Sequence, residues 1–420
     1  MMMQTQAALH ITVNDGANTV GVLARSAEQD GIYLFDYRKD LLAKSLIEQR
    51  QHAVSLTMPV TNVQYDAMTT LHPIFEMNLP EGALRVKLQQ RFAKAIPNFD
   101  ALDLLGIVGQ SQLGRLLYLP SSNATSVAVP EQNIRQLLTY QGSEDLFADL
   151  MDRYALHSGV SGMQPKVLLR AGGKMSDLKL DRITDKGATH IVKSFDSREY
   201  FDLCAVEFFC MQAAKLSGLN TANVTLSDNR KILLVERFDL ADGHYSGFED
   251  FCVLSGKRAD GRYDSSYERL AQLVTIYVDP AHRAHDLHQL FKTVVLACVI
   301  GNGDAHLKNF AVLYDDIGVN VRLSPIYDMV STLPYMPRDS MALTLGDSKA
   351  FPDAKQLMAF GKHHCFLTQV AVRRVMEEVQ TGVKASIIRM RRYAAKNPSF
   401  AKTAEKLVEI FRAGMEKSLA

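Results

Sequence analysis

The spacing of hydrophobic and polar residues differs between the two halves of this chain. Before about residue 267, short apolar runs bounded by turn residues predict β-strands. Apolar positions three and four residues apart predict two helices in the same half. The predicted strands cover residues 31–35, 167–170, 190–195 and 231–238, and the predicted helices cover residues 81–95 and 200–216.

Beyond residue 267 the pattern becomes mostly helical. Helical periodicity predicts helices over residues 287–300, 362–380 and 400–417. The exception is a predicted hairpin, in which residues 310–314 and 319–323 form strands joined by a turn. The second half is therefore expected to be a helical lobe that carries one hairpin.

A polar segment separates the first strands from the rest of the chain. Residues 121–129 are rich in Ser, Asn and Thr, and Pro130 follows them. A chain of 420 residues exceeds the size of one hydrophobic core, about 250 to 300 residues. We predict a small α/β N-terminal subdomain over residues 1–120, an N-lobe over residues 131–255 and a mostly helical C-lobe over residues 256–420.

Composition narrows the choice of function. Lys and Arg number 47 against 46 Asp and Glu, so nucleic acid would be bound only locally or through a partner. The most apolar run, residues 294–300, is too short to span a bilayer, and the first residues do not resemble a signal peptide. We expect a cytoplasmic protein without a membrane partner, whose five cysteines are buried reduced thiols.

Candidate catalytic residues follow the apolar helix that ends near Ile300. Asp304 and Asn309 have the Asp-x-x-x-x-Asn spacing of a kinase catalytic loop, where the Asp accepts the substrate's hydroxyl proton and the Asn binds magnesium. The predicted hairpin would return the chain to the same place and bring Asp328 there as a second magnesium ligand. In the alternative interpretation, Asp304 and Asn309 only cap a turn.

Two further stretches could bind phosphates. Residues 158–166 are rich in Gly and Ser and precede a predicted strand, so their backbone N–H groups could approach phosphates, although such a segment is often only a turn. Lys193 shares a strand face with apolar neighbours, and Glu207 lies in an apolar helix. Each needs a partner, so we predict that they pair and orient a nucleotide phosphate, the alternative being a purely structural ion pair.

Together, five motifs resemble those of the HipA family of bacterial toxin kinases. They are Ser-Gly-Met-Gln-Pro-Lys at 161–166, Thr-His-Ile-Val-Lys at 189–193, Val-Glu-Arg-Phe-Asp at 235–239, Gly-Asp-Ala-His-Leu-Lys-Asn-Phe at 303–310 and Tyr-Asp-Met-Val-Ser at 327–331. The resemblance implies an α+β, two-lobed protein-kinase-like fold and a serine/threonine-protein kinase that uses ATP and Mg²⁺.

The resemblance also implies residue roles. Asp304 is similar to the catalytic base, and Asn309 and Asp328 to the magnesium ligands. The ATP-binding residues that it implies are Gly162, Gln164, Lys166, Lys193, Glu207, Glu236, Phe238, His306 and Lys308, with Glu236 and Phe238 in the hinge that meets adenine. The family's self-phosphorylated serine is replaced here by Gly159, so Ser161, or less favourably Ser158, is the expected autophosphorylation site.

Partners are implied in the same way. Family resemblance predicts a helix-turn-helix antitoxin similar to HipB, which would supply the contact with DNA, and a protein substrate from the translation machinery of the aminoacyl-tRNA synthetase class. Two other functions stay open. The chain could act without catalysis as a co-repressor beside the antitoxin, or it could be a small-molecule phosphotransferase.

Overall fold

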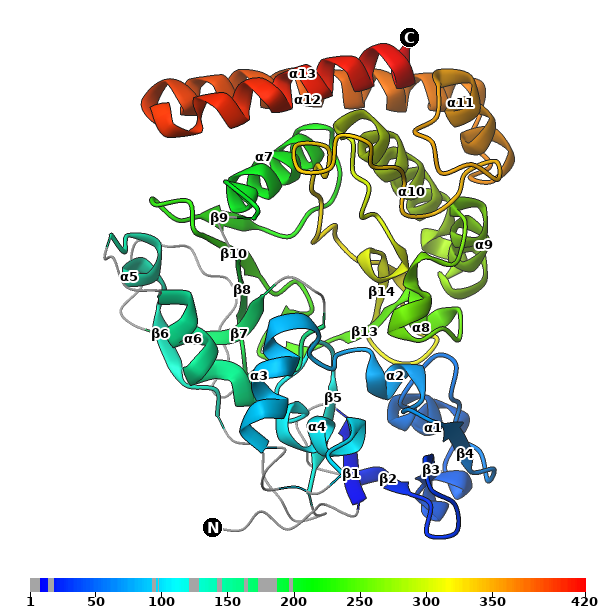
Figure 1. Cartoon of the computed structure of the whole chain (residues 1–420). Helices are drawn as coiled ribbons and strands as arrows, with labels where there is room; N and C mark the ends of the chain where they lie inside the picture. The colour runs from blue at the N-terminus through cyan, green and yellow to red at the C-terminus, as the bar shows by residue number, and fades with distance from the viewer. Residues whose placement is uncertain are drawn as a thin grey trace. The chain divides into compact units, whose positions relative to one another are not determined.

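The computed structural model describes residues 8–13, 19–92, 96, 98–120, 128–141, 146–161, 165–172, 187–195 and 199–420. The chain divides into two compact units (Figure 1). The first unit comprises Met1–Ser194, Ser227–Ala259 and Leu313–Asn320, and the second comprises Phe195–Leu226, Asp260–Val312 and Val321–Ala420. The predicted boundaries near residues 120 and 255 stay predictions.

The first unit begins with an antiparallel five-stranded sheet in the order β4-β3-β2-β1-β5. A carboxylate cluster fastens helix α4 (Ala101–Val108) to this sheet. Asp100 caps the helix by accepting from the backbone of Leu102 and Asp103, and Arg25 of β2 binds both Asp100 and Asp103. The strands are β1 (Ala8–Val13), β2 (Thr19–Arg25), β3 (Ile32–Tyr37), β4 (Tyr65–Met68) and β5 (Leu116–Leu119), and the other helices are α1 (Leu46–His52), α2 (Pro73–Glu76) and α3 (Gly82–Phe92).

A second sheet of the first unit holds the nucleotide-binding candidates. In it, β6 (Glu131–Asn133) pairs in parallel with β7 (Lys166–Gly172), and β7, β8 (His190–Ser194) and β10 (Ile232–Glu236) are antiparallel neighbours. All five residues of β8 are buried, so both of its faces are covered. The remaining elements are α5 (Ile134–Leu138), α6 (Leu146–Tyr154), β11 (Leu240–Ala241), β12 (His244–Tyr245), β13 (Gly247–Asp250) and α8 (Phe251–Leu254).

The second unit is mainly helical. Figure 1 shows its last two helices, α12 (Gln369–Lys396) and α13 (Ala401–Leu419), running alongside each other. Small residues allow close packing: a Cβ on Gly414 of α13 would lie 2.0 Å from the carbonyl oxygen of Val299. The other elements are α7 (Leu203–Leu216), β9 (Val224–Leu226), η3 (Ala259–Tyr263), α9 (Tyr267–Tyr277), α10 (Pro280–Ile300), η4 (Leu307–Asn309), β15 (Arg322–Leu323) and α11 (Ala354–His363). Strand β14 (Ala311–Tyr314) starts in this unit, and its last two residues belong to the first unit.

Most predicted elements are confirmed, with three corrections. The helix predicted from residue 200 starts at Leu203, because Asp202 adopts a left-handed backbone with φ of 53°. The strand predicted over residues 319–323 is reduced to Arg322–Leu323. The single helix predicted over residues 362–380 is wrong: α11 ends at His363, Phe366 is left-handed, and Thr368 caps the start of α12.

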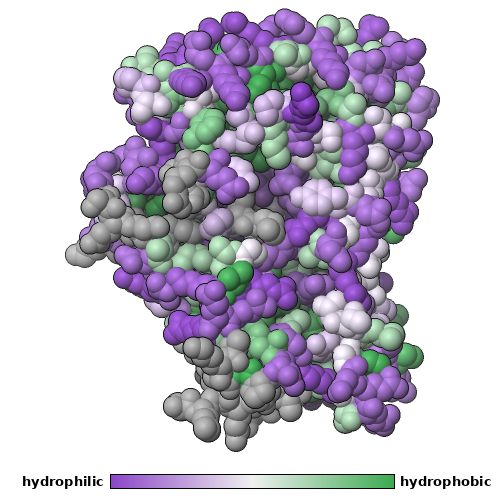
Figure 2. Space-filling view, viewed as in Figure 1, coloured by the Kyte–Doolittle hydropathy of each residue, from purple (hydrophilic) through white to green (hydrophobic). Residues whose placement is uncertain are grey.

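The cysteines and the surface agree with an ordinary globular chain. All five cysteines are buried and unpaired with one another, as predicted. Figure 2 shows hydrophilic side chains over most of the visible face, with apolar ones singly or in small groups between them. Among the helices of the described residues, none combines the length and apolar character that a bilayer crossing requires.

Candidate active site

The candidate catalytic loop begins where α10 ends. Gly301 follows the helix in the left-handed conformation, with φ of 68°, and the N–H of Asn302 bonds back to the carbonyl of Ala297 at 2.8 Å. The helix itself is held in the core by a nearly continuous buried stretch, residues 290–300. The polar loop therefore leaves a rigid element in a defined direction.

Hydrogen bonds within the loop fix the backbone of Asp304. Its N–H donates to Asn302 Oδ1 at 2.9 Å, and its carbonyl accepts from the N–H of His306 at 2.8 Å. The side-chain nitrogen of Asn309 donates to the same carbonyl at 2.7 Å. Asp304 and Asn309 are thus brought together by direct contact.

The carboxylate of Asp304 faces a small group of aromatic side chains. Tyr263 donates to Asp304 Oδ1 at 2.8 Å, and its ring meets that of His306 edge to face at 5.0 Å. His306 Nε2 lies 3.8 Å from Asp304 Oδ1, beyond hydrogen-bond distance. Burial, assisted by the charge of Arg262, lowers the pKa of His306 to about 3, so this histidine is neutral at ordinary pH.

The hairpin returns Asp328 to the loop that carries Asp304 and Asn309. Strands β14 and β15 pair through the N–H of Ser324 and the carbonyl of Ala311, at 2.9 Å. Beyond β15, both neighbours of Asp328 contact the loop: Tyr327 donates to the carbonyl of Lys308, and Met329 Sδ accepts from the Asn302 side chain at 3.4 Å. Asp328 therefore lies beside the Asp304–Asn309 loop.

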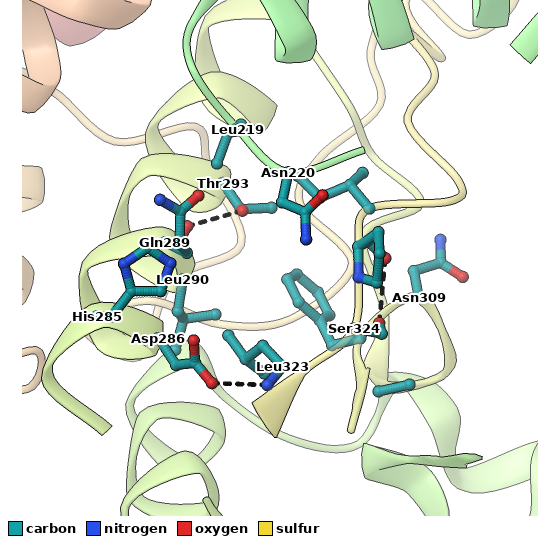
Figure 3. A pocket seen from close by; sticks show the side chains of 14 residues that line it. Leu219, Asn220, His285, Asp286, Gln289, Leu290, Thr293, Asn309, Leu323 and Ser324 are labelled. Atoms are coloured by element: carbon teal, nitrogen blue, oxygen red, sulfur yellow. Dashed lines mark hydrogen bonds between the residues drawn. The ribbon is translucent and has the colours of Figure 1, made fainter. Parts of the chain in front are cut away.

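A small cavity of about 50 Å³ in the second unit is lined in part by Asn309. Figure 3 shows polar side chains on its wall, including Asp286 and Gln289 of α10, Asn309 and Ser324. Asp286 Oδ2 accepts from the N–H of Leu323 at 2.6 Å, so α10 directly holds the strand that leads to Asp328. The segment that leads to Asp328 is thereby tied to the same helix as the loop that carries Asp304.

Several of these supporting residues were missed by sequence reasoning. Thr332 accepts from the N–H of Gly303 at 3.0 Å and donates to Asp339, and a Cβ on Gly303 would lie 2.0 Å from Asp339 Oδ2. Tyr263 and Asp286 were also missed. None of them belongs to a short motif with a recognised spacing, so only tertiary contacts reveal their part in the site.

Two predicted phosphate-binding lysines meet in the first unit. Lys166 of β7 and Lys193 of β8 are directly opposite each other in the antiparallel register, and only 8% and 3% of their surfaces are exposed. Directly opposed residues on an antiparallel pair point to the same face. Glu207 is fully buried in the second unit, so its predicted pairing with Lys193 stays a prediction.

The loop that precedes β7 is described only in part. Gly162 and Gln164 lie outside the described residues, whereas Ser161 is partly exposed. Ser158 is fully buried, donates to the carbonyl of Tyr154 at 2.7 Å and accepts from the N–H of Leu168 at 2.9 Å. A kinase could reach its hydroxyl only after this segment opened, which weighs against Ser158 as a phosphorylation site.

The predicted adenine hinge is anchored by an ion pair that sequence reasoning did not single out. Between Glu236 and Phe238, Arg237 binds both carboxylate oxygens of Asp239, at 3.0 and 2.6 Å. The N–H of Gly114 donates to the same carboxylate at 2.7 Å. Arg237 also lies 4.1 Å from the ring centre of Tyr245, and both members of the pair are buried.

Comparisons with known proteins show which family and fold this chain shares. The HipA N-terminal domain matches residues 9–119, and the HipA-like C-terminal domain matches residues 158–387. A chain in the solved complex of the Shewanella oneidensis MR-1 toxin-antitoxin proteins HipA and HipB with operator DNA shares the fold, with a TM-score of 0.68 and 20% identity over 97% of both chains. The chain thus has an α+β, protein-kinase-like fold.

Proteins related in sequence support the same family. The serine/threonine-protein kinase toxin HipA of Shewanella oneidensis is 25% identical over 85% of this chain and 84% of its own length. Y4dM of Sinorhizobium fredii, a protein inferred to be a kinase, is 26% identical over 76% of this chain and 74% of its own length. The chain belongs to the HipA family, as its motifs predicted.

Proposed function

We propose that this protein is an ATP- and Mg²⁺-dependent serine/threonine-protein kinase in which Asp304 is the catalytic base. The observation that carries the proposal is the shared scaffold of Asp304, Asn309 and Asp328. The first two are joined by a hydrogen bond of 2.7 Å, and contacts from both neighbours of Asp328 hold it beside them. A base and two oxygen ligands in one place are what phosphoryl transfer requires.

Magnesium fits the oxygen ligands of this site. The side-chain nitrogen of Asn309 donates to the carbonyl of Asp304, so its oxygen is the atom that could bind a cation. We propose the carboxylate of Asp328 as the second ligand. Within the described part of the chain, no group of three or more His, Cys, Asp or Glu side chains could hold a metal ion by itself. Mg²⁺ typically binds one or two protein oxygens together with the substrate's phosphates, and Asn309 and Asp328 would supply two such oxygens. When bound, it would neutralise charge on the phosphates.

The opposed lysines of β7 and β8 support a phosphate site. Lys166 and Lys193 are directly opposed and almost fully buried, so two positive charges lie on one face of the sheet. Like charges directly across an antiparallel pair repel each other, and nucleotide phosphates on this face would reduce that repulsion. We propose that Glu236 and Phe238 hold the adenine, and that Gly162, Gln164, Glu207, His306 and Lys308 complete the ATP site.

Regulation and partners follow from the same proposal. Ser161 is the preferred autophosphorylation site, because it is partly exposed whereas Ser158 is buried and hydrogen-bonded. A phosphate there would place about two negative charges near the ATP phosphates and repel them. We further propose a HipB-like antitoxin partner, through which DNA is contacted, and a substrate of the aminoacyl-tRNA synthetase class.

The test compares the purified parent with Asp304→Ala. Each protein is treated with phosphatase, incubated with Mg²⁺ and γ-labelled ATP, alone and with a panel of aminoacyl-tRNA synthetases, and the label is located by peptide mapping. We expect Asp304→Ala to lower transfer by about 10²- to 10⁴-fold, the usual contribution of a positioned base. Asp66→Ala, an exposed carboxylate on β4, is the matched control and should transfer label normally.

Label on Ser161 of the parent would support the autophosphorylation proposal, and label on one synthetase would identify the substrate class. A parent that binds ATP yet transfers nothing would contradict the kinase proposal. Equal transfer by parent and Asp304→Ala would contradict the assignment of the base.

A further inference from the structure

Tyr263 is placed unusually for a residue outside the catalytic loop. It is the last residue of η3, and 43% of its surface is exposed. Even so, its hydroxyl donates to Asp304 Oδ1 at 2.8 Å, the length of a good O–H···O⁻ hydrogen bond. An exposed tyrosine therefore covers one oxygen of the proposed catalytic base.

The same geometry is required of a substrate. A protein hydroxyl about to receive a phosphoryl group must lie within about 2.6–3.2 Å of the base that takes its proton. The Tyr263 hydroxyl satisfies this condition from within the chain. The backbone of Asp304 is held on both sides by Asn302 and Asn309, so the exposed tyrosine is the partner able to move away.

The ring of Tyr263 has its own support. It contacts His306 edge to face at 5.0 Å, and the guanidinium of Arg262 lies 5.9 Å from its centre. Phenylalanine would keep the ring contacts and remove only the hydroxyl. The contribution of the hydroxyl can therefore be separated from that of the ring.

We infer that Tyr263 occupies the acceptor position of the active site and must leave it before another hydroxyl can be phosphorylated. This inference rests on the proposed role of Asp304. Tyr263 then acts as an internal competitor, so that an acceptor is used only if it binds well enough to displace the phenol. It is a residue that sets acceptor selectivity, in addition to the base and the metal ligands.

The kinetic test uses water as the acceptor, because water needs no identified substrate. Steady-state hydrolysis of MgATP is compared for the parent, Tyr263→Phe and Tyr200→Phe, the last being an exposed tyrosine outside the catalytic loop. Loss of a hydrogen bond to a charged group should raise kcat for hydrolysis about tenfold in Tyr263→Phe, with an unchanged KM for ATP. Tyr200→Phe should match the parent. An unchanged or lower kcat in Tyr263→Phe would overturn the inference.

A second measurement does not depend on kinase activity. Tetranitromethane nitrates exposed tyrosines, and mass spectrometry compares Tyr263 with Tyr200 in the parent and in Asp304→Ala. Nitration requires loss of the phenol proton, and in the parent that proton is donated to Asp304 Oδ1, so Asp304→Ala should nitrate Tyr263 several times faster while Tyr200 is unaffected. Equal nitration of Tyr263 in both proteins would refute the contact. Faster nitration in a protein without any phosphotransfer would instead refute the proposed function and leave the contact established.

Discussion

Replacing Asp239 with Asn should damage both the stability of the first unit and its affinity for ATP. In the parent, this carboxylate accepts two hydrogen bonds from Arg237, at 3.0 and 2.6 Å, and one from the N–H of Gly114 at 2.7 Å. Only 1% of the Arg237 surface is exposed. Burial lowers the pKa of Arg237, and the charge of Asp239 more than offsets this and raises it. Without Asp239 the arginine would still be charged, because a guanidinium is protonated at any ordinary pH.

The expected loss of stability in Asp239→Asn follows from the burial of Arg237. Removing one partner of a buried ion pair typically costs about 3–5 kcal/mol, because the other charge is left uncompensated. Asparagine keeps one acceptor oxygen but turns an amide N–H₂ toward the guanidinium. We therefore expect the free energy of opening of this sheet to fall by about 3 kcal/mol, which corresponds to roughly a 10²-fold increase in the open population.

Hydrogen exchange followed by mass spectrometry measures the opening of this sheet separately from the rest of the chain. A local method is needed because a chain of two units need not unfold in one step. Amides of β8 and β10 should exchange about 10²-fold faster in Asp239→Asn, and the Kd for ATP should rise, since Glu236 and Phe238 are the neighbours of Arg237 along the chain. The double variant Arg237→Met/Asp239→Leu should recover most of the protection, because no buried charge remains. Unchanged exchange in Asp239→Asn would refute the reasoning.

Three further predictions concern the second unit. Gly303→Ala should lower kcat about 10²-fold, since its Cβ would lie 2.0 Å from Asp339 Oδ2 and displace Asp304; steady-state kinetics with a parental kcat would exclude this. Asp286→Ala should raise the KM for Mg²⁺ about tenfold by releasing the N–H of Leu323, bonded at 2.6 Å, and an unchanged magnesium titration would contradict it. His306 has a folded pKa of about 3 against an ordinary 6.5, so it stabilises the fold above pH 6.5 and this contribution is lost as pH falls. His306→Asn should therefore lose about 2 kcal/mol less stability than the parent between pH 7.5 and pH 5 in urea unfolding, and equal losses would count against the assignment.

Local sequence patterns predicted the elements around the site because apolar spacing and end signals such as glycine act within a few residues. The apolar run that ends at Ile300 and the glycine after it predict a helix followed by a loop, and α10 ends there. The wrong prediction of a single helix over residues 362–380 also comes from relying on local apolar spacing. Periodicity continues across the break, but Phe366 adopts a left-handed backbone and Thr368 caps a new helix, which apolar spacing does not record.

The sequence by itself determined the family, through its motifs, and with the family the kinase-like fold. It also placed Asp304 and Asn309 in one loop, because residues five apart after the end of a helix stay close in space. Contacts between distant segments were decided only by the tertiary structure. Examples are the phenol of Tyr263 on Asp304, 41 residues away, and the backbone of Gly114 on Asp239, 125 residues away. The physical reason is that such partners share no period or motif: they meet only when packing of the surrounding apolar core fixes the distance between their elements.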